Sequence, residues 1–445
     1  MRPCRVPRKR IGSRVDEASK PLKDRMLWGA WRAIGGTAVA GSRVLAAWRS
    51  GPSKHDLEQR LAMPMTLAAL PHDGLWLHAA SVGEVRALVP LARALRPRLN
   101  QPASLVTTST ITGRALAEKE LGVSVRLAPL DGAGPLHRFM TTVRPRLHVV
   151  VETEIWPLRF SLLASQRIPL ALVSARLSER RWPTYRRLSG LYARALDAIT
   201  LLCPASEEDA ERFSALGVSR SRFGPIGSLK WDAAAAPFDV HELTRLANTL
   251  GVDRSRPWLV MGSVHPGEGL SLLAALAGGT AGAALPCGVL LAPRHLDRFA
   301  PELQRVEQSG WRVHRASSGP APPHTDVIVL DALGLLARVY SLATAATMGG
   351  TFVDVGGHTP LEAAVAGCPL VAGPYRDKQS DLCAPLASAG ALVPVASVAA
   401  AAEVLRGWLK DDVARRRAGE AGRAVVAEHR GVSDRISVAV SELWR

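Results

Sequence analysis

The sequence predicts an α/β protein built from two Rossmann-like domains, whose parallel sheets face a central crevice. Three observations support this prediction. From residue 75 onward, short apolar runs alternate with amphipathic helical stretches, which is the pattern of βαβ units in a parallel sheet. With 445 residues the chain is too long for one ordinary core, so two domains are expected. A hydrophobic fraction of 47% with only 5% aromatic residues fits an Ala-, Leu- and Val-rich α/β protein.

The N-terminal residues are expected to lie outside the two domains. Residues 1–25 carry nine Lys and Arg against three acidic residues and show no apolar period, which predicts a flexible basic extension. Residues 26–48 are apolar, with tryptophans at 28, 31 and 48 and interrupting arginines at 32 and 43. Such a segment fits a helix in a membrane interface, or a helix packed on the domain. The preceding basic extension favours the membrane.

Two series of strand-like runs define the domains. The first domain, residues 49–226, has its runs at 75–80, 104–109, 147–152 and 170–175. The second domain, residues 227–445, has its runs at 258–263, 288–293, 326–331, 346–350 and 369–373, and an Arg-rich helical stretch at 400–430. Each half opens with a strand, a Ser-Val turn and a Gly-Glu pair at a helix start: Gly83-Glu84 and Gly267-Glu268. Paired domains of this kind bind ligands at the carboxyl ends of their strands.

The net charge of +17 predicts a basic surface. Nucleic acid, an anionic membrane face or a phosphorylated substrate would account for it, and so would arginines on solvated helix faces. The loop 179–187 interleaves four arginines with Trp182 and Tyr185, but no nucleic-acid-binding motif accompanies it, so we predict no nucleic-acid partner. Five scattered cysteines without C-x-x-C spacing indicate neither a zinc site nor a disulfide framework. The sequence contains no run of about 20 uncharged apolar residues, so no membrane-spanning helix is predicted.

Residues 346–366 form the most informative stretch. A strand ends in two glycine pairs, at 349–350 and 356–357, and a helix start follows. Thr359 is a good N-cap, Pro360 suits the first helical position, and Glu362 would complete a capping box. Glycines allow close approach of a ligand, and a helix start attracts anions, so a nucleotide site is indicated. An ordinary, well-capped βα turn fits the same pattern equally well.

Acidic residues follow two strands of the first domain. Glu84 stands at a helix start directly after a strand, where a carboxylate would act as general base for an acceptor hydroxyl, or merely favour the helix as a first-turn acid. Because the helix dipole favours the ionised form, burial must raise the pKa of a base placed there. Glu152 and Glu154 alternate after the strand-like segment LHVVV (147–151) and are expected on one side, paired with Arg176. A structural salt bridge between two loops is the alternative.

Cationic residues near the domain junction and in the second domain are candidates for phosphate binding. Lys230 would stabilise charge on a leaving phosphate, or be a solvated linker lysine. Arg294, after Pro293 at a strand end, would grip a phosphate through two hydrogen bonds. His265, His295 and His358 are expected near the same crevice, but no pair has H-x-x-x-H spacing, so no metal is predicted.

Eight segments together resemble the 3-deoxy-D-manno-octulosonic acid (Kdo) transferases, inverting glycosyltransferases of the GT-B fold. They occur in the family's order and cover about residues 26–430. The matching segments are WLHAASVGE, VVVETEIWP, VSARLSERR, GSLKWD, GSVHPGE, APRHLDRF, GGTFVDVGGHTPLEAA and GPYRDKQSDL.

The resemblance implies transfer of Kdo from CMP-Kdo to a lipid A precursor, lipid IVA, in lipopolysaccharide synthesis at the cytoplasmic face of the inner membrane, without metal or cofactor. It implies that Glu84 is the proton acceptor and that Glu152 and Lys230 stabilise the transition state. The implied CMP-binding residues are Pro293, Arg294, Leu333, Gly334, Leu335, Thr359, Pro360, Leu361 and Glu362, with His265, His358 and Arg176 as further candidates.

The chain departs from the family at two of these positions. The family usually has Asn where this chain has Thr359, and many members have a polar residue at the position of Leu335. A transferase using another nucleotide sugar is therefore one alternative. A nucleotide-sugar 2-epimerase-like isomerase and a non-catalytic binding protein are others, but the apolar helix 26–48 and the intact acidic and basic residues argue against them.

Overall fold

The computed structural model describes residues 22–234, 239–332 and 334–444, and these form two compact units. The first unit comprises the described residues up to Ala233 together with residues 431–444, and the second comprises those from Ala234 to Arg430. The expected boundary fell at residue 227, with the whole C-terminus in the second domain. Most of the expected basic extension, residues 1–21, lies outside the described residues.

The return of the C-terminus to the first unit has a clear physical cause. The carboxylate of Asp232 accepts the backbone N–H groups of Gly431 at 2.7 Å and Ser433 at 2.5 Å. Helix α20 (Val432–Ser441) then packs on α4 (Val82–Arg98), and Val432 joins the first unit's core. Contacts between residues 200 positions apart leave no local pattern in the sequence, so they were not predicted.

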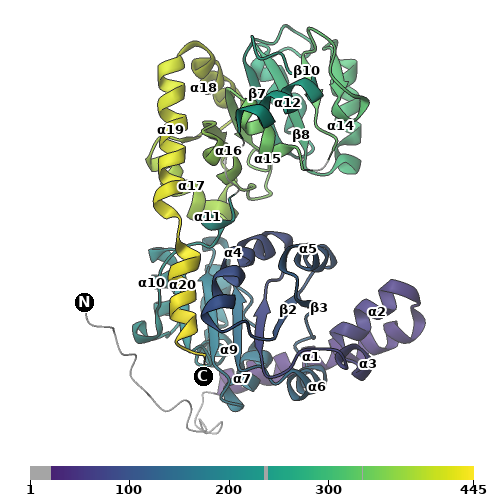
Figure 1. Cartoon of the computed structure of the whole chain (residues 1–445), viewed down its shortest axis with the longest axis vertical. Helices are drawn as coiled ribbons and strands as arrows, with labels where there is room; N and C mark the ends of the chain where they lie inside the picture. The colour runs from purple at the N-terminus through teal and green to yellow at the C-terminus, as the bar shows by residue number, and fades with distance from the viewer. Residues whose placement is uncertain (1–21, 235–238, 333, 445) are drawn as a thin grey trace. The chain divides into compact units, whose positions relative to one another are not determined.

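The first unit is a doubly wound parallel sheet (Figure 1). Its order is β3-β2-β1-β4-β5-β6, and every neighbouring pair is parallel. The strands are β1 (Leu75–His78), β2 (Ser104–Thr108), β3 (Ser124–Leu127), β4 (Leu147–Val151), β5 (Leu170–Ala175) and β6 (Leu201–Pro204). The helices that follow these strands are α4, α5 (Ile111–Leu121), α6 (Ala133–Val143), α7 (Pro157–Ser165), α8 (Trp182–Arg187), α9 (Ser189–Leu196), α10 (Glu207–Ala215) and α11 (Lys230–Ala233).

Both faces of this sheet are buried, which explains why its strands are continuously apolar. Leu75 and Leu77 of β1 belong to one hydrophobic cluster, whereas Trp76 between them belongs to another. The first cluster packs under α4 and α20 and the second under α6, α7 and α9. Successive side chains of a strand point to opposite faces, so one short apolar run supplies both layers.

The second unit has the same architecture with seven strands in the order β13-β12-β11-β7-β8-β10-β9, all parallel. The strands are β7 (Trp258–Val264), β8 (Gly288–Pro293), β9 (Val313–Arg315), β10 (Val327–Val329), β11 (Ala345–Met348), β12 (Leu370–Ala372) and β13 (Leu392–Pro394). The helices are α12 (Val240–Leu250), α13 (Gly269–Leu276), α14 (Leu296–Gln308), α15 (Leu336–Val339), α16 (Leu361–Ala366), α17 (Ser380–Ser388), α18 (Val398–Lys410) and α19 (Asp412–His429).

The strand order of each sheet fixes where a ligand site belongs. The order reverses between β1 and β4 in the first sheet and between β7 and β11 in the second. In open parallel sheets, ligands bind beyond the carboxyl ends of the two strands at this reversal. The sequence segments that follow these four strands begin at Ala79, Glu152, His265 and Gly349.

Helix α1 (Leu22–Trp48) packs along α2 (Gly51–Arg60), α6 and α9 of the first unit (Figure 1). The indole N–H of Trp31 donates to Asp131 at 2.8 Å, and the guanidinium of Arg194 lies 3.9 Å from the ring centre of Trp28. Two of the three tryptophans expected at membrane depth therefore anchor the helix to the protein, because Asp131 and Arg194 offer them polar partners. Trp48 is 86% exposed.

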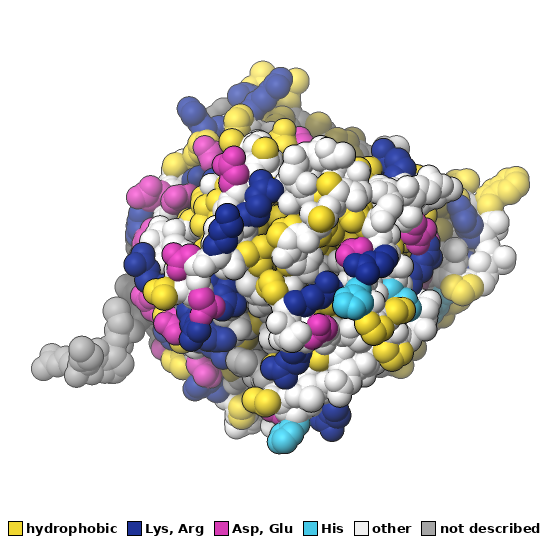
Figure 2. Space-filling view, turned by 90° about the horizontal axis from the view of Figure 1, so that it is seen from above, with side chains coloured by type: hydrophobic (Ala, Val, Ile, Leu, Met, Phe, Trp, Pro, Cys, Tyr) yellow, Lys and Arg dark blue, Asp and Glu magenta, His cyan; other side chains and the backbone are white. Residues whose placement is uncertain are grey.

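None of the helices within the described ranges is long and apolar enough to cross a membrane. On the face drawn in Figure 2, Lys and Arg side chains are interspersed with Asp and Glu side chains. The positive charge of the sequence is thus not gathered into one uniform patch on that face.

Candidate active site

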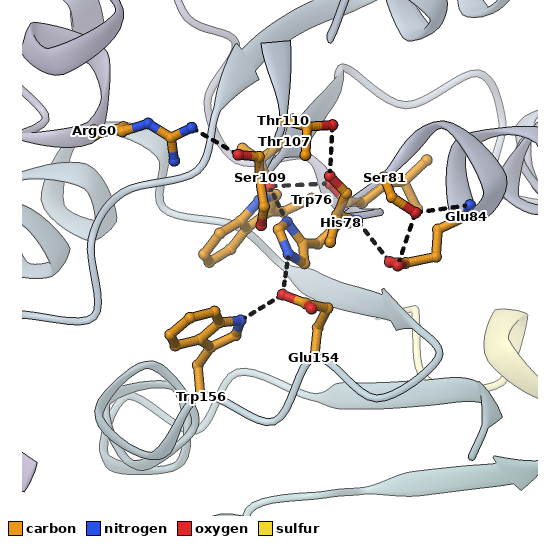
Figure 3. A network of polar contacts seen from close by, with 12 residues as sticks. Arg60, Trp76, His78, Ser81, Glu84, Thr107, Ser109, Thr110, Glu154 and Trp156 are labelled. Atoms are coloured by element: carbon orange, nitrogen blue, oxygen red, sulfur yellow. Dashed lines mark hydrogen bonds and ion pairs between the residues drawn. The ribbon is translucent and has the colours of Figure 1, made fainter. Parts of the chain in front are cut away.

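Glu84 lies in the first turn of α4, just beyond the carboxyl end of β1. Ser81 caps this helix, and the carboxylate of Glu84 folds back onto the turn (Figure 3). It accepts the backbone N–H of Ala80 at 2.6 Å and the hydroxyl of Ser81 at 3.1 Å. The Ser-Val-Gly-Glu sequence thus fixes a carboxylate at the switch point of the sheet.

The pKa of Glu84 is raised to about 8. Burial is the main cause, the negative charges of Glu152 and Glu154 add to it, and the hydrogen bond from Ala80 opposes it. Burial therefore raises the pKa of Glu84, as the sequence led us to require of a general base placed at a helix start. A carboxylate with a pKa near the working pH suits a general base.

Glu152 and Lys230 form an ion pair beside this carboxylate. Nζ of Lys230 lies 2.9 Å from Oε1 of Glu152, and both side chains are largely buried, at 16% and 18% exposure. Oε1 of Glu152 has no hydrogen-bonding partner among the described residues, so its contact with Lys230 is an ion pair. Lys230 is the first residue of α11. It is therefore not a solvated linker lysine.

The backbone turns at Glu152, which has a φ of 59°. This left-handed conformation is uncommon for a residue other than glycine and is found where surrounding structure enforces it. The expected extended alternation of residues 152–154 is therefore wrong, because Glu152 and Thr153 form a turn. Both Glu152 and Glu154 nevertheless act on Glu84, so the two carboxylates do lie near one site.

Glu154 belongs to a network that the sequence did not reveal (Figure 3). Its carboxylate accepts the indole N–H of Trp156 at 2.7 Å and faces Nε2 of the buried His78 at 3.4 Å. The other ring nitrogen of His78 lies 2.9 Å from the Thr107 hydroxyl. Burial, aided by Arg159, lowers the pKa of His78 to about 4, so the ring is neutral and its Nε2–H donates to Glu154.

This network keeps Glu154 ionised. Burial would raise its pKa, but the hydrogen bonds from His78 and Trp156 and the charge of Arg159 hold the pKa below its ordinary value. The negative charge maintained there raises the pKa of Glu84. A polar histidine within the apolar run LWLHAA was the only sequence signal of this arrangement.

Arg176 and the Arg-rich segment 179–187 differ from their expected roles. Arg176 contacts the Glu152 turn through its backbone carbonyl, which accepts the Thr153 hydroxyl at 2.5 Å. Glu152 pairs with Lys230 and Glu154 with His78 instead. Residues 179–187 form a 3-10 turn and α8 rather than a loop, and Trp182 and Tyr185 pack against the core. Their rings are held by packing, so the expected interleaved surface is not formed.

In the second unit, the candidate residues follow β7, β8 and β11. Glycines at 350, 356 and 357 have φ values of 70°, 93° and 79°, as the glycine pairs predicted. The buried carboxylate of Glu268 holds this turn, because it accepts the N–H groups of His265 at 2.8 Å, Gly350 at 2.7 Å and Phe352 at 2.9 Å. Glu268 therefore corresponds to Glu84 in its position after the first strand of its unit, but its carboxylate holds the turn through hydrogen bonds and is not assigned as a base.

The helix after the glycine turn starts differently from the prediction. Helix α16 begins at Leu361, and the Thr359 hydroxyl accepts the N–H of Leu361 at 3.3 Å. The predicted capping box, with Thr359 bonded to the third helical residue, is wrong, because Pro360 takes the position before the helix. Pro293 ends β8 and Arg294 follows it. Gly334 and Leu335 precede α15, whereas Leu333 lies outside the described residues.

Two histidine rings meet beyond β7 and β11. Nε2 of His265 lies 2.8 Å from Nε2 of His358, and the rings are stacked with 5.1 Å between their centres and an angle of 8°. Burial, His265 and Arg294 lower the pKa of His358 to about 4. Across the parts of the chain that the structure describes, no three His, Cys, Asp or Glu side chains are placed to hold a metal ion.

Residues 55–233 match the family described as 3-deoxy-D-manno-octulosonic-acid transferase (kdotransferase). The 3-deoxy-D-manno-octulosonic acid transferase of Bordetella pertussis is 30% identical over 83% of this chain and 87% of its own length. The enzyme of the same name from Haemophilus influenzae is also 30% identical, over 88% of this chain and 92% of its own. The chain belongs to the Kdo transferase family.

This Kdo transferase is accordingly an enzyme, a glycosyltransferase, and its two parallel sheets form the GT-B fold. The HepE protein of Anabaena, solved in complex with UDP, shares the fold with a TM-score of 0.56 over 83% of this chain and 97% of its own. At 14% identity that likeness concerns the fold alone. Family membership decides against the isomerase and the non-catalytic alternatives.

Proposed function

We propose that this Kdo transferase moves Kdo from CMP-Kdo to a hydroxyl of a lipid A precursor, lipid IVA, with inversion and without a metal ion. The observation that carries the proposal is Glu84, a carboxylate with a pKa raised to about 8 at the switch point of the first sheet. Once ionised, such a group is a stronger base than an ordinary carboxylate and takes a proton from an attacking hydroxyl more readily.

On the acceptor side, Glu84 receives the hydroxyl proton as the oxygen attacks the anomeric carbon. The bond from that carbon to the phosphate oxygen breaks, and its electron pair leaves with CMP. Lys230, positioned by Glu152 at 2.9 Å, supplies the positive charge that stabilises the transition state. Direct displacement by one hydroxyl inverts the anomeric centre.

On the donor side, we assign the CMP to the residues after β8, β10 and β11. Arg294 supplies the guanidinium for phosphate, and Gly334 and Leu335 supply backbone groups at the start of α15. Thr359, Pro360, Leu361 and Glu362 form the start of α16, and Leu333 completes the proposed set outside the described residues. Since side chains and backbone supply the charge stabilisation, the proposal requires no cofactor.

The exposed face of α1 supports a lipid acceptor and an anionic membrane surface. Six exposed large apolar residues project from it: Leu22, Met26, Ile34, Val44, Leu45 and Trp48. At about 100° per residue these positions fall within an arc of roughly 140°, away from the buried Trp28 and Ala46.

Arg25, Arg32 and Arg43 align along one edge of this apolar face, where guanidinium groups reach lipid phosphates. A surface pocket of about 470 Å³ opens beside α1 and is lined mainly by small apolar residues of α1 and α6. We assign it to an acyl chain of the acceptor. The enzyme would then work on the cytoplasmic face of the inner membrane.

The test is transfer by the purified protein in detergent, with CMP-Kdo generated in situ and a tetraacylated lipid A precursor as acceptor. The product is identified by mass, with and without a chelator. One or more added Kdo units in the presence of chelator support donor, acceptor and metal independence together. Transfer only from another nucleotide sugar would instead assign a different donor and make Thr359 and Leu335 its determinants.

A further inference from the structure

The structure points to a proton-linked phosphate site at the His265–His358 pair. We propose that this pair takes up one proton when the phosphate of the donor or of the CMP product binds, and returns that proton to the leaving phosphate. The inference rests on the proposed CMP-sugar activity and adds the residues and the proton that serve the leaving group.

The two rings lie close enough to share one proton in a hydrogen bond. Their Nε2 atoms are 2.8 Å apart, so one nitrogen donates and the other accepts. They come from the ends of β7 and β11, the strands at the switch point of the second sheet. Gly350 lies against both, because a Cβ there would stand 3.3 Å from His358 and 3.4 Å from His265. The backbone of the glycine turn thus leaves space for the pair and no more.

Three cations act on the pair. Arg294 follows β8, Arg298 belongs to α14, and Lys378 lies in the segment before α17. His295 also follows β8, and burial and the two arginines lower its pKa, so it is a neutral neighbour near pH 7. The ring of His295 is 6.2 Å from that of His265, and the stem of Lys378 lies over Gly356. The buried carboxylate of Glu268 at this turn is occupied by three backbone N–H groups. A carboxylate oxygen of Asp377 also lies against Gly356, and the charge of Asp297 acts on His295.

These charges determine whether the histidine pair takes up or releases a proton when an anion binds. Burial and the surrounding cations lower the pKa of both His265 and His358, so the empty pair is neutral near pH 7. A phosphate dianion reverses the local field, favours the charged imidazolium and raises that pKa. Binding of the anion and uptake of a proton are therefore coupled, each favouring the other.

The transfer step balances with this proton. The bond between the anomeric carbon and the phosphate oxygen breaks, and the electron pair stays on that oxygen. The imidazolium proton passes to the phosphate, whose second pKa is about 6 in a phosphate monoester, while Glu84 holds the proton of the acceptor hydroxyl. Solvent restores both protein groups after the products leave.

The structure also favours this reading over a core histidine pair. His265 is half-exposed, and its neighbour Pro266 is exposed, so a ligand reaches the ring from solvent. A structural pair would need no cluster of three cations, Arg294, Arg298 and Lys378, around it. An anion such as phosphate is attracted to a site that several cations face.

The experiment measures CMP binding to the full-length protein by calorimetry in two buffers of different ionisation enthalpy. Between about pH 7 and about pH 9 the CMP phosphate is a dianion, so any proton taken up comes to the protein. We expect uptake approaching one proton per CMP, with affinity falling several-fold to tenfold per pH unit across this range. Cytidine, which lacks the phosphate, should show no uptake.

Three variants locate the proton. His358→Gln and His265→Gln should each lose the uptake and flatten the pH dependence of CMP affinity. His241→Gln, at an exposed position of α12, is the matched control and should behave as the wild type. Glu84→Gln should also retain the uptake, because Glu84 belongs to the other unit.

The possible outcomes distinguish a failure of this inference from a failure of the proposed function on which it rests. CMP binding with no proton uptake, or uptake that persists in both histidine variants, would overturn the inference while leaving the CMP-sugar donor in place. A lack of CMP binding at every pH would overturn the donor assignment, and the inference with it. The wild-type measurement decides even if a histidine variant fails to fold.

Discussion

Lys230 and Glu152 lie far apart in the sequence, one at the start of α11 and one after β4, and meet at 2.9 Å beside Glu84. The left-handed turn at Glu152, with a φ of 59°, aims its carboxylate at the start of α11. The pair keeps a largely buried cation at the switch point of the sheet. A cation fixed in advance stabilises developing negative charge without reorganisation during the reaction.

Replacing Lys230 by Met should lower kcat by about 100-fold or more, because the variant loses a preorganised positive charge and leaves Glu152 buried without its partner. KM for the donor should change less than kcat. Steady-state transfer kinetics give both values. If kcat fell only in proportion to the fall in melting temperature across a series of such variants, the ion pair would be purely structural.

The coupling of the pair is measurable in a double-mutant cycle. Glu152→Gln and Lys230→Met should be strongly non-additive, since the side chains are in contact. Arg222→Met, which removes a surface arginine of the same unit that bonds backbone carbonyls, serves as an independent partner and should add to Glu152→Gln. Additive losses from Glu152 and Lys230 would contradict the proposed joint role.

Glu154→Gln should shift the acidic limb of the pH–rate profile to lower pH. Glu84 must be ionised to act as base, and the charge of Glu154 helps to raise its pKa after burial and Glu152. Removing that charge lowers the pKa of Glu84, so the base ionises earlier. The midpoint of kcat/KM against pH is the quantity to measure.

Glu179→Gln is the control for that shift, since Glu179 is an exposed acid of the same unit that does not contribute to the pKa of Glu84. It should leave the midpoint unchanged. A midpoint that is insensitive to Glu154→Gln would mean that a group other than Glu84 sets the acidic limb.

Glu84 should also make the protein less stable as pH rises. Its pKa is about 8 when folded and 4.5 in the ordinary state, so between these values the folded protein holds a proton that the unfolded chain lacks. Stability therefore falls with rising pH across that window. Glu84→Gln removes this term, so its melting temperature should decline less than that of the wild type between about pH 5 and about pH 9. Parallel declines in the two proteins would contradict the raised pKa.

The sequence predicted the central strands of both sheets and missed those nearer the edges. The runs at β1, β4, β5, β7 and β8 are apolar because both faces are buried. The missed strands are the edge strands β3, β6, β9 and β13, which have three or four residues each. Residues such as Arg126, Arg315 and Pro394 also interrupt the apolar pattern of β3, β9 and β13. Local pattern does not separate such segments from loops, since their pairing depends on neighbours far away in the sequence.

The site was predictable to the level of residue types but not of partners. Glu84 and Lys230 stand out by position, and the pKa condition on Glu84 follows from the helix dipole and burial. The partner of Glu152 depends on a left-handed turn at a residue that is not glycine, so the sequence did not indicate the turn. Sequence reasoning favoured Arg176 as the partner instead of Lys230. His78 and Arg159 are buried polar residues whose roles appear only once the strands and α7 pack together.

The apolar face of α1 should bind anionic membranes. Trp48→Ser and Met26→Ser should each weaken partition into vesicles containing phosphatidylglycerol, by about tenfold for the tryptophan. Both residues are exposed, at 86% and 66%, so the melting temperature of the free protein should hardly change. Vesicle sedimentation at low and high salt measures the partition.

Val413→Ser, which removes an exposed apolar side chain of α19 in the second unit, is the control and should leave vesicle binding unchanged. Loss of binding in Arg32→Gln with Arg43→Gln should be largest at low salt, since exposed charges are screened by salt. If the α1 and α19 variants bind equally well, α1 is not the membrane-binding element.

The most direct measurement is Kdo transfer by wild type and Glu84→Gln at matched protein concentration, together with CMP affinity for both. We expect the variant to lose transfer by a factor of about 100 to 10,000 while binding CMP as tightly as the wild type, because Glu84 serves the acceptor hydroxyl alone. A variant that transfers Kdo at the wild-type rate would contradict the assignment of Glu84 as the general base.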